Sequence, residues 1–194
     1  MSKQADQTPF SGKSEQRNYL LDSEVKSLID AAKRTGRYGQ RDGLMVLMAY
    51  RHGLRASELV SLRWDQVMLD KGLIHVERVK NGDDSKQPLS GEEIRALRAL
   101  KRDQGDSAFV FCTERKGPME VSGFNKLVKR AGVVAGIDLD VHPHMLRHAC
   151  GHKLAAAGQD TRAIQGYLGH KNIKNTVIYT NLAENRFRDF AKII

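Results

Sequence analysis

Apolar residues recur at helical spacing along most of this chain. One such stripe, within residues 25–32, predicts an amphipathic helix that Asp22 or Ser23 caps. By contrast, residues 1–18 have almost no large apolar side chains and predict a flexible arm. Further helices are predicted over residues 41–52, from 54 onward, and over 94–101, 123–135, 144–157, 161–168 and 172–179. The pattern is that of a mainly helical protein.

Polar residues before these stripes predict where several helices begin. Ser90, Ser122 and Asp160 each stand near the start of an apolar stripe and are predicted N-caps, because their side-chain oxygens can accept a backbone N–H. Glu93 follows Ser90 at the spacing of a capping box.

Residues 67–89 change to a β-type pattern. Residues 67–69 and 73–79 predict two strands joined by a short turn. Residues 86–89 predict a third, short strand at the sheet edge, because Pro88 has no N–H to donate. We therefore expect one α+β domain, mainly helical, with a small three-stranded antiparallel sheet.

Charge and composition indicate which class of partner the protein binds and in which cellular compartment it is found. The 194 residues include 32 Lys and Arg against 23 Asp and Glu, a net charge of +9. With a pI near 9.7, this excess indicates a polyanionic partner such as nucleic acid. No apolar run approaches the roughly 20 residues of a membrane span, and no apolar leader is visible, so no membrane partner is expected. Cys112 and Cys150 are too few for a disulfide framework, and we expect a cytoplasmic protein with reduced, buried thiols.

Two basic side chains at a predicted helix start indicate an anion site. His144 and Arg147 are three positions apart and project from one face of the first turn, where the helix N-terminus also favours an anion. Arg55 begins another helix, three residues before Glu58. Each pair has an ordinary alternative: a surface His and Arg, or a simple salt bridge between Arg55 and Glu58.

The order of these and other residues is more informative than any one of them. Lys80 in a predicted turn, His170 after Leu-Gly, and Tyr179 have ordinary interpretations too: a solvated lysine, a helix C-cap donor and a core side chain. Six residues, however, resemble in order and spacing the signature of the tyrosine recombinase (phage integrase) family: Arg55, Lys80, His144, Arg147, His170 and Tyr179.

The resemblance covers nearly the whole chain. In that family the catalytic domain carries R-x-S/G-E-L, a lysine in a β-hairpin turn, H-x-x-R, L-G-H and then the tyrosine. The run at 142–148, with Cys-Gly soon after, is most similar to the short fimbrial phase-variation invertases of enteric bacteria. The resemblance implies a tyrosine recombinase catalytic-domain fold over residues 19–194, with no separate N-terminal core-binding domain.

The family chemistry assigns a role to each matching residue. The resemblance implies that Tyr179 attacks a scissile phosphodiester and forms a 3′-phosphotyrosyl bond. Arg55 and Arg147 would grip the non-bridging oxygens, and cations near Tyr179 would favour its phenolate. Lys80 would protonate the leaving 5′-oxygen, and Glu58 would orient Arg55.

The two motif histidines complete this assignment. His144 would accept the proton of the tyrosine or position the phosphate, and His170 would hydrogen-bond a phosphate oxygen. This chemistry needs no metal, no ATP and no other cofactor.

The resemblance also implies the partners. These are double-stranded DNA with inverted-repeat recombination sites, a homotetramer that exchanges strands through a Holliday junction, and host DNA-bending proteins. The expected outcome is inversion of a promoter element in fimbrial phase variation.

Basic residues that fit phosphate contacts are Lys126, Lys129, Arg130, Lys153, Lys171 and Lys174. The first three share one helical face, so their helix is the candidate for groove insertion. The apolar segment 185–194 either packs within the chain or docks on a neighbouring subunit.

Other functions stay open from the sequence. His144, His148 and His152 recur every four residues near Cys150 and could suggest a zinc site, but Arg147 beside them opposes a cation. We interpret His148 and His152 as residues of the helix face or core. A recombinase-derived DNA-binding regulator without catalysis, an integrase of a mobile element and a type IB topoisomerase are the remaining alternatives.

Overall fold

The computed structural model describes residues 17–79 and 82–181. The predicted arm, apart from Arg17 and Asn18, and the C-terminal segment 185–194 lie outside these ranges. The described elements are α1 (Asp22–Arg34), α2 (Gly39–Arg51), α3 (Ala56–Val60), the 3-10 helix η1 (Trp64–Gln66), β1 (Val67–Met68), β2 (Leu73–Val76), β3 (Ser85–Pro88), α4 (Gly91–Gln104), α5 (Val121–Val134), α6 (Pro143–Ala156), α7 (Thr161–Leu168) and α8 (Lys174–Asn181). The expected α+β class, mainly helical with one small sheet, is confirmed.

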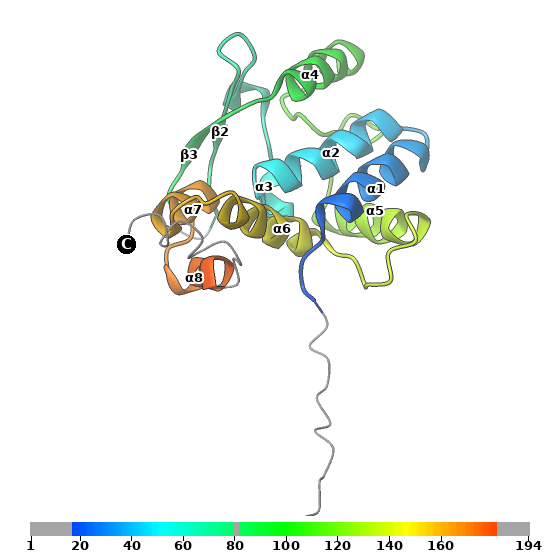
Figure 1. Ribbon diagram of the computed structural model, residues 1–194. Helices are drawn as coiled ribbons and strands as arrows, with labels where there is room; N and C mark the ends of the chain where they lie inside the picture. Colours follow the sequence, from blue (N-terminus) through cyan, green and yellow to red (C-terminus); the bar gives the residue numbers. More distant parts are fainter. Residues whose placement is uncertain (1–16, 80–81, 182–194) are drawn as a thin grey trace, which may run out of the picture.

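Helix α6 lies at the centre of the arrangement. On one side it packs against α2, which also contacts α1, and on the other it packs against α7 and α8 (Figure 1). Leu28, Met45, Phe124 and Leu146 come from α1, α2, α5 and α6, and all are fully buried in the main core. Burial of each such side chain contributes roughly 1.5–3 kcal/mol to folding, so α6 is held firmly from several directions.

The sheet has the order β1-β2-β3, antiparallel throughout, with Ile74 opposite Gln87. Strand β3 is at the edge, as Pro88 requires. The second strand ends at Val76, three residues earlier than predicted. The cause is Arg78, whose backbone N–H donates to the Asp84 carboxylate at 2.7 Å instead of to a strand. The end of the hairpin formed by β2 and β3 then lies against α7 (Figure 1).

The predicted caps are partly confirmed. The Ser90 hydroxyl accepts the Glu93 N–H, and Asp160 accepts two backbone N–H groups of α7. The predictions for α1 and α5 are wrong, because both helices begin earlier. Their N-caps are Leu21, whose N–H donates to the Glu24 carboxylate, and Glu120.

Two compositional expectations can be compared with the structure. Cys112 and Cys150 are both free and buried, as predicted. Among the helices that the structure describes, none combines the length and the apolar character needed to span a bilayer.

Candidate active site

The site begins at the tight junction between α2 and α3. Gly53 has a φ of 55°, and a Cβ there would lie 2.3 Å from a methyl group of Leu168, so only glycine fits. Two residues later, Arg55 donates to the Glu58 carboxylate from its backbone N–H at 2.9 Å and from Nη1 at 2.6 Å. Glu58 is buried and Arg55 is half-buried. The predicted salt bridge is therefore present, and it holds one side of a guanidinium whose other side stays accessible.

Arg147 is buried, which rules out the surface alternative. Pro143 at the first position of α6 helps to start that helix, and Arg147 follows one turn later. Its Nη1 donates to the Gly53 carbonyl at 2.5 Å and its Nη2 to the Leu168 carbonyl at 2.7 Å. Burial, with the guanidiniums of Arg55 and Arg78, lowers the pKa of Arg147 to about 10, which leaves it cationic at neutral pH. Both acceptors are neutral, so the charge of Arg147 is not cancelled by them.

Tyr179 of α8 packs its ring against α6. A Cβ at Gly151 would lie 2.6 Å from this ring, so the glycine makes room for the tyrosine. The ring of His152 is edge-on to it, with 5.0 Å between ring centroids. Burial raises the pKa of Tyr179 to about 12, although the Arg147 guanidinium opposes the shift. The Arg147 cation thus favours the phenolate, as expected, but burial has the larger effect, and the hydroxyl of Tyr179 stays protonated at neutral pH.

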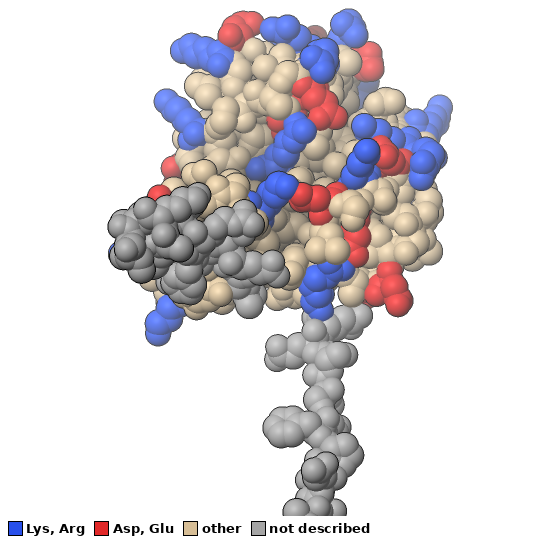
Figure 2. Space-filling view, in the orientation of Figure 1, with Lys and Arg blue, Asp and Glu red and all other residues tan. Residues whose placement is uncertain are grey.

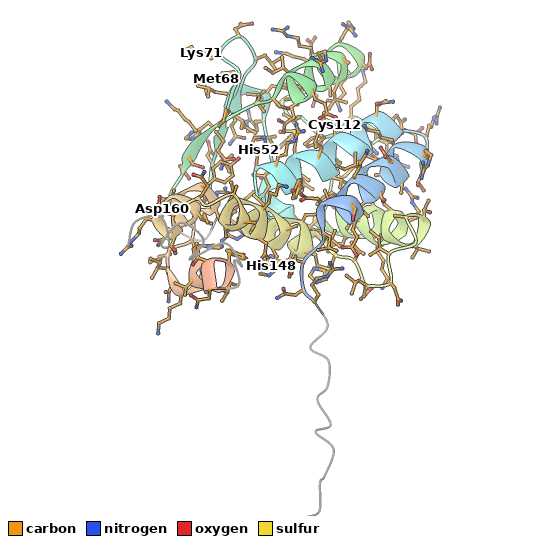
Figure 3. All side chains as sticks on the ribbon, in the orientation of Figure 1. His52, Met68, Lys71, Cys112, His148 and Asp160 are labelled. Atoms are coloured by element: carbon orange, nitrogen blue, oxygen red, sulfur yellow. The ribbon has the colours of Figure 1, made fainter. Side chains whose placement is uncertain are left out.

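The partner of the tyrosine hydroxyl is His148, not His144. Nδ1 of His148 lies 2.9 Å from the hydroxyl oxygen of Tyr179, and Figure 3 shows His148 on the side of α6 that faces α8. His144 is exposed, and its ring meets the edge of the His148 ring at a centroid distance of 4.4 Å. Burial, followed by the charge of His144, lowers the pKa of His148 to about 4, so at neutral pH its ring is an uncharged proton acceptor. Sequence analysis missed this residue, although its four-residue spacing from His144 placed both on one helix face.

His170 follows the end of α7, where Gly169 adopts the left-handed conformation with a φ of 64°. Its Nδ1 lies 2.9 Å from the Thr176 hydroxyl, and its ring stacks on Tyr179 with 6.3 Å between centroids. Burial, with the charge of Arg147, lowers the pKa of His170 to about 4. The structure thus brings His170 to the same place as the tyrosine.

Acidification from about pH 7 to about pH 5 is expected to destabilise the protein. The pKa of His148 and of His170 falls from 6.5 to about 4 on folding, so between these values the unfolded chain binds more protons than the folded one. For each of the two histidines, the free energy of unfolding then falls by up to about 1.4 kcal/mol for every unit by which the pH is lowered. Urea unfolding across this range measures the slope. It should become shallower in His148→Gln, and an unchanged slope would contradict the burial argument.

Lys129 is a predicted DNA-contact residue that lies beside the site. It lines a surface hollow together with Arg55 and His144, and its ammonium pairs with Asp140 at 2.9 Å. Part of α5 therefore borders the same opening as the candidate phosphate-binding groups.

The other predicted contacts lie apart from this hollow. Lys126 and Arg130, exposed on the same helix as Lys129, line a different hollow, which Arg55 does not border. Lys153 pairs with Asp22, and Lys171 and Lys174 are exposed near His170. Lys80, the predicted general acid, lies outside the described residues. On the face seen in Figure 2, Lys and Arg alternate with Asp and Glu, and no single basic patch forms there.

The row of histidines on α6 does not form a metal site. Within residues 17–79 and 82–181, no group of three His, Cys, Asp or Glu side chains is placed to hold an ion. His148 instead contacts Tyr179. His152 lies between Tyr179 and Tyr19, and the ring centroids of His152 and Tyr19 are 3.9 Å apart.

The structure gathers Arg147, His148 and His170 around Tyr179, and its fold matches the catalytic domains of tyrosine recombinases. The sequence pattern described as "Phage integrase family" matches residues 18–186, and the chain belongs to this family. "Type 1 fimbriae regulatory protein FimB" of Escherichia coli K12 is 39% identical over 176 residues, which cover 88% of each protein.

Two solved structures show the same fold. XerA recombinase superposes with a TM-score of 0.76 and 29% identity over 90% of this chain and 64% of that chain. XerH bound to palindromic difH substrate, in a post-cleavage complex, has a TM-score of 0.75 at 21% identity, over 90% of this chain and 52% of that chain. The chain therefore spans between about half and about two thirds of the length of these two structures.

Proposed function

We propose that this protein is a site-specific DNA recombinase that cuts and rejoins double-stranded DNA through a 3′-phosphotyrosyl intermediate. The observation that carries the proposal is the hydrogen bond between the Tyr179 hydroxyl and an uncharged His148, beside the cationic Arg147 and in the same chain. A nucleophile, a proton acceptor and a fixed positive charge are the groups that phosphoryl transfer requires.

In the proposed cleavage step, Arg55 and Arg147 bind the non-bridging oxygens of the phosphodiester and stabilise the charge of the pentavalent transition state. The Tyr179 oxygen forms a bond to phosphorus while its proton passes to Nδ1 of His148. The bond from phosphorus to the 5′-oxygen breaks, and Lys80 supplies the proton that this oxygen takes up. Religation reverses these steps, so no ATP is consumed.

Three further side chains support this step. His144 and His170 donate hydrogen bonds to phosphate oxygens, and Glu58 orients Arg55 through the contacts described above. The arginines supply the electrostatic stabilisation, and the proposed reaction uses no metal and no cofactor.

The proposed biological outcome is inversion of a promoter element in fimbrial phase variation. Support comes from FimB, which matches this chain over most of both lengths and is named a fimbriae regulatory protein. XerH, of the same fold, is bound to a palindromic DNA substrate. We accordingly assign inverted-repeat DNA as the substrate, a homotetramer as the active assembly, host DNA-bending proteins as accessory partners and the cytoplasmic nucleoid as the place of action. Residues 19–194 form the catalytic domain in this proposal.

Covalent attachment to DNA tests the chemistry. Purified protein is incubated in EDTA with labelled DNA from the regions that flank its gene. An SDS-resistant protein–DNA adduct is expected, and a duplex nicked close to the cut should trap it in higher yield. If nicked and intact DNA are both bound in a salt-sensitive manner without any adduct, the protein is a regulator rather than a recombinase.

A plasmid assay then tests whether recombination inverts the DNA between two sites. Two copies of the mapped site are placed in inverted or in direct orientation around a marker segment. The inversion proposal predicts that the marker is flipped with inverted copies. Insertion of a free circle as the main product would favour the integrase of a mobile element.

Lys129 should contribute to the salt dependence of DNA binding. In Lys129→Ala the slope of log affinity against log salt concentration is expected to decrease by about 1, because one phosphate contact is lost beside the site. Lys71→Ala provides a matched control, since this exposed lysine lies in the turn between β1 and β2, at the end of the sheet away from α6 and α7 (Figure 3). Fluorescence anisotropy with the mapped DNA measures both slopes. Equal slopes for the two variants would place the DNA elsewhere.

A further inference from the structure

Arg78 has a fully buried side chain that neither the motif pattern nor the proposed reaction uses. It stands two residues beyond β2, and its guanidinium reaches across to α3 and to the end of α7. We propose that Arg78 is a positioning residue, which fixes the separate segments that carry Arg55, Arg147 and His170 in their relative places. This inference rests on the proposed function.

The first link runs through Glu58 to Arg55. Nη1 of Arg78 donates to Oε2 of Glu58 at 2.8 Å, while Oε1 of Glu58 accepts Nη1 of Arg55 at 2.6 Å. Burial opposes the ionised form of Glu58, but the Arg55 N–H and the Arg78 guanidinium outweigh it and hold the pKa of Glu58 below its ordinary value. One carboxylate is thus shared by two guanidiniums, so Arg55 is oriented without being neutralised.

The second link is the backbone between α2 and α3. Nη1 of Arg78 also donates to the Gly53 carbonyl at 3.4 Å, and its Nη2 donates to the His52 carbonyl at 3.2 Å. The Gly53 carbonyl is the same oxygen that accepts Nη1 of Arg147. A shift of this junction would therefore move Arg147 as well.

The third link reaches the segment before His170. Nη2 of Arg78 donates to the Tyr167 carbonyl at 2.5 Å, which ties the end of α7 to the hairpin. A Cβ at Gly169 would lie 2.5 Å from Cγ of Arg78, so the arginine side chain lies directly on the residue that precedes His170. This contact gives a physical reason for the glycine of the Leu-Gly-His motif.

Stability alone does not account for a charge at this position. A buried ion pair often contributes no more to folding than apolar residues of similar size. Among the described residues, moreover, Nε of Arg78 has no hydrogen-bond partner, which is a cost to folding. In Arg78→Met, Glu58 would keep Arg55 as its partner, so the variant can fold while the positioning contacts are lost.

The test compares Arg78→Met with Arg41→Met in the full chain. Arg41 is also largely buried and paired with a carboxylate, Asp42 at 2.7 Å, and it donates to the Cys112 carbonyl away from the site. The probe is a nicked duplex of the site mapped by adduct formation, with protein in excess. Affinity, the single-turnover rate constant and the amplitude of adduct formation are recorded separately.

Arg78→Met is expected to lower the rate constant on the order of 10²-fold, with unchanged affinity and amplitude, because small displacements of reacting groups have effects of this size. Arg78→Lys should recover roughly 10-fold of this loss, since lysine restores the charge but lacks the planar fork. Arg41→Met should cleave at the wild-type rate. A wild-type rate constant in Arg78→Met, or a loss of amplitude only, would overturn the proposal.

A second measurement does not depend on cleavage. The Nε–H signals of Arg55 and Arg147 in NMR spectra of the isotope-labelled chain should shift and broaden in Arg78→Met and stay in place in Arg41→Met. Unchanged signals in Arg78→Met would overturn the positioning role. If wild-type protein forms no adduct with any DNA, the proposed function fails, and these spectra still decide whether Arg78 holds the two arginines.

Discussion

Tyr179→Phe is expected to abolish covalent attachment to DNA, with a loss of more than about 10⁴-fold in the rate of adduct formation. The substitution removes only the hydroxyl that would form the bond to phosphorus. The ring can keep its place against Gly151 and His152, so folding and DNA affinity should persist. The measurement is the yield of SDS-resistant adduct in EDTA, with anisotropy to confirm that the DNA is still bound.

Tyr167→Phe is the matched control for this experiment. Tyr167 is also a largely buried tyrosine, and its hydroxyl donates to the Arg51 carbonyl at 2.9 Å. Its loss costs a hydrogen bond of about 1 kcal/mol but removes no proposed nucleophile. The adduct should therefore form in Tyr167→Phe. An adduct that persists in Tyr179→Phe would show that another residue attacks the DNA.

Arg147→Lys is expected to reduce the cleavage rate constant by about 10³-fold, although the charge is conserved. The guanidinium spans the Gly53 and Leu168 carbonyls, and in the proposed reaction it also binds a phosphate oxygen. An ammonium cannot serve both carbonyls and a phosphate oxygen in the same geometry. The variant should also lose about 1–3 kcal/mol of stability, because a buried carbonyl is left without its donor. Single-turnover cleavage and urea unfolding measure the two effects.

Arg51→Lys separates the role of the site from a general sensitivity to the loss of an arginine. Arg51 is half-buried and pairs with Glu92 at 3.0 Å, so its replacement also removes a guanidinium that is held by oxygen acceptors, here outside the site. Its rate constant should stay within about three-fold of the wild type. A similar loss in both variants would mean that Arg147 acts through stability alone.

The regular elements could be predicted from the sequence because local signals specify them. The apolar stripe of α1, the Pro88 edge strand and the Asp160 cap each depend on neighbouring residues only, and each is present. Helix starts were less predictable. Ser122 can cap a helix, but here α5 begins before it, and the Ser122 hydroxyl donates to the Glu120 carboxylate at 3.0 Å.

In the site, too, residues that belong to a sequence motif could be predicted, whereas residues whose role depends on tertiary contacts could not. Arg55, Arg147, His170 and Tyr179 were found through their order along the chain, and the structure brings them together. The sequence does not point to His148 and Arg78, because their contacts join segments far apart in the chain. The His148 contact depends on how α8 packs on α6, and spacing along one helix does not reveal such packing.

The packing of α8 on α6 within one chain also has a consequence for mixtures of subunits. The Tyr179 hydroxyl contacts His148 of its own polypeptide and lies in the field of Arg147 of the same chain, so two different defective subunits cannot lend each other the missing group. Co-expression of Tyr179→Phe with Arg147→Lys would then give no complementation. In the proposed homotetramer, either variant would act as a dominant inhibitor of intact subunits, because it would occupy DNA sites that it cuts slowly or not at all.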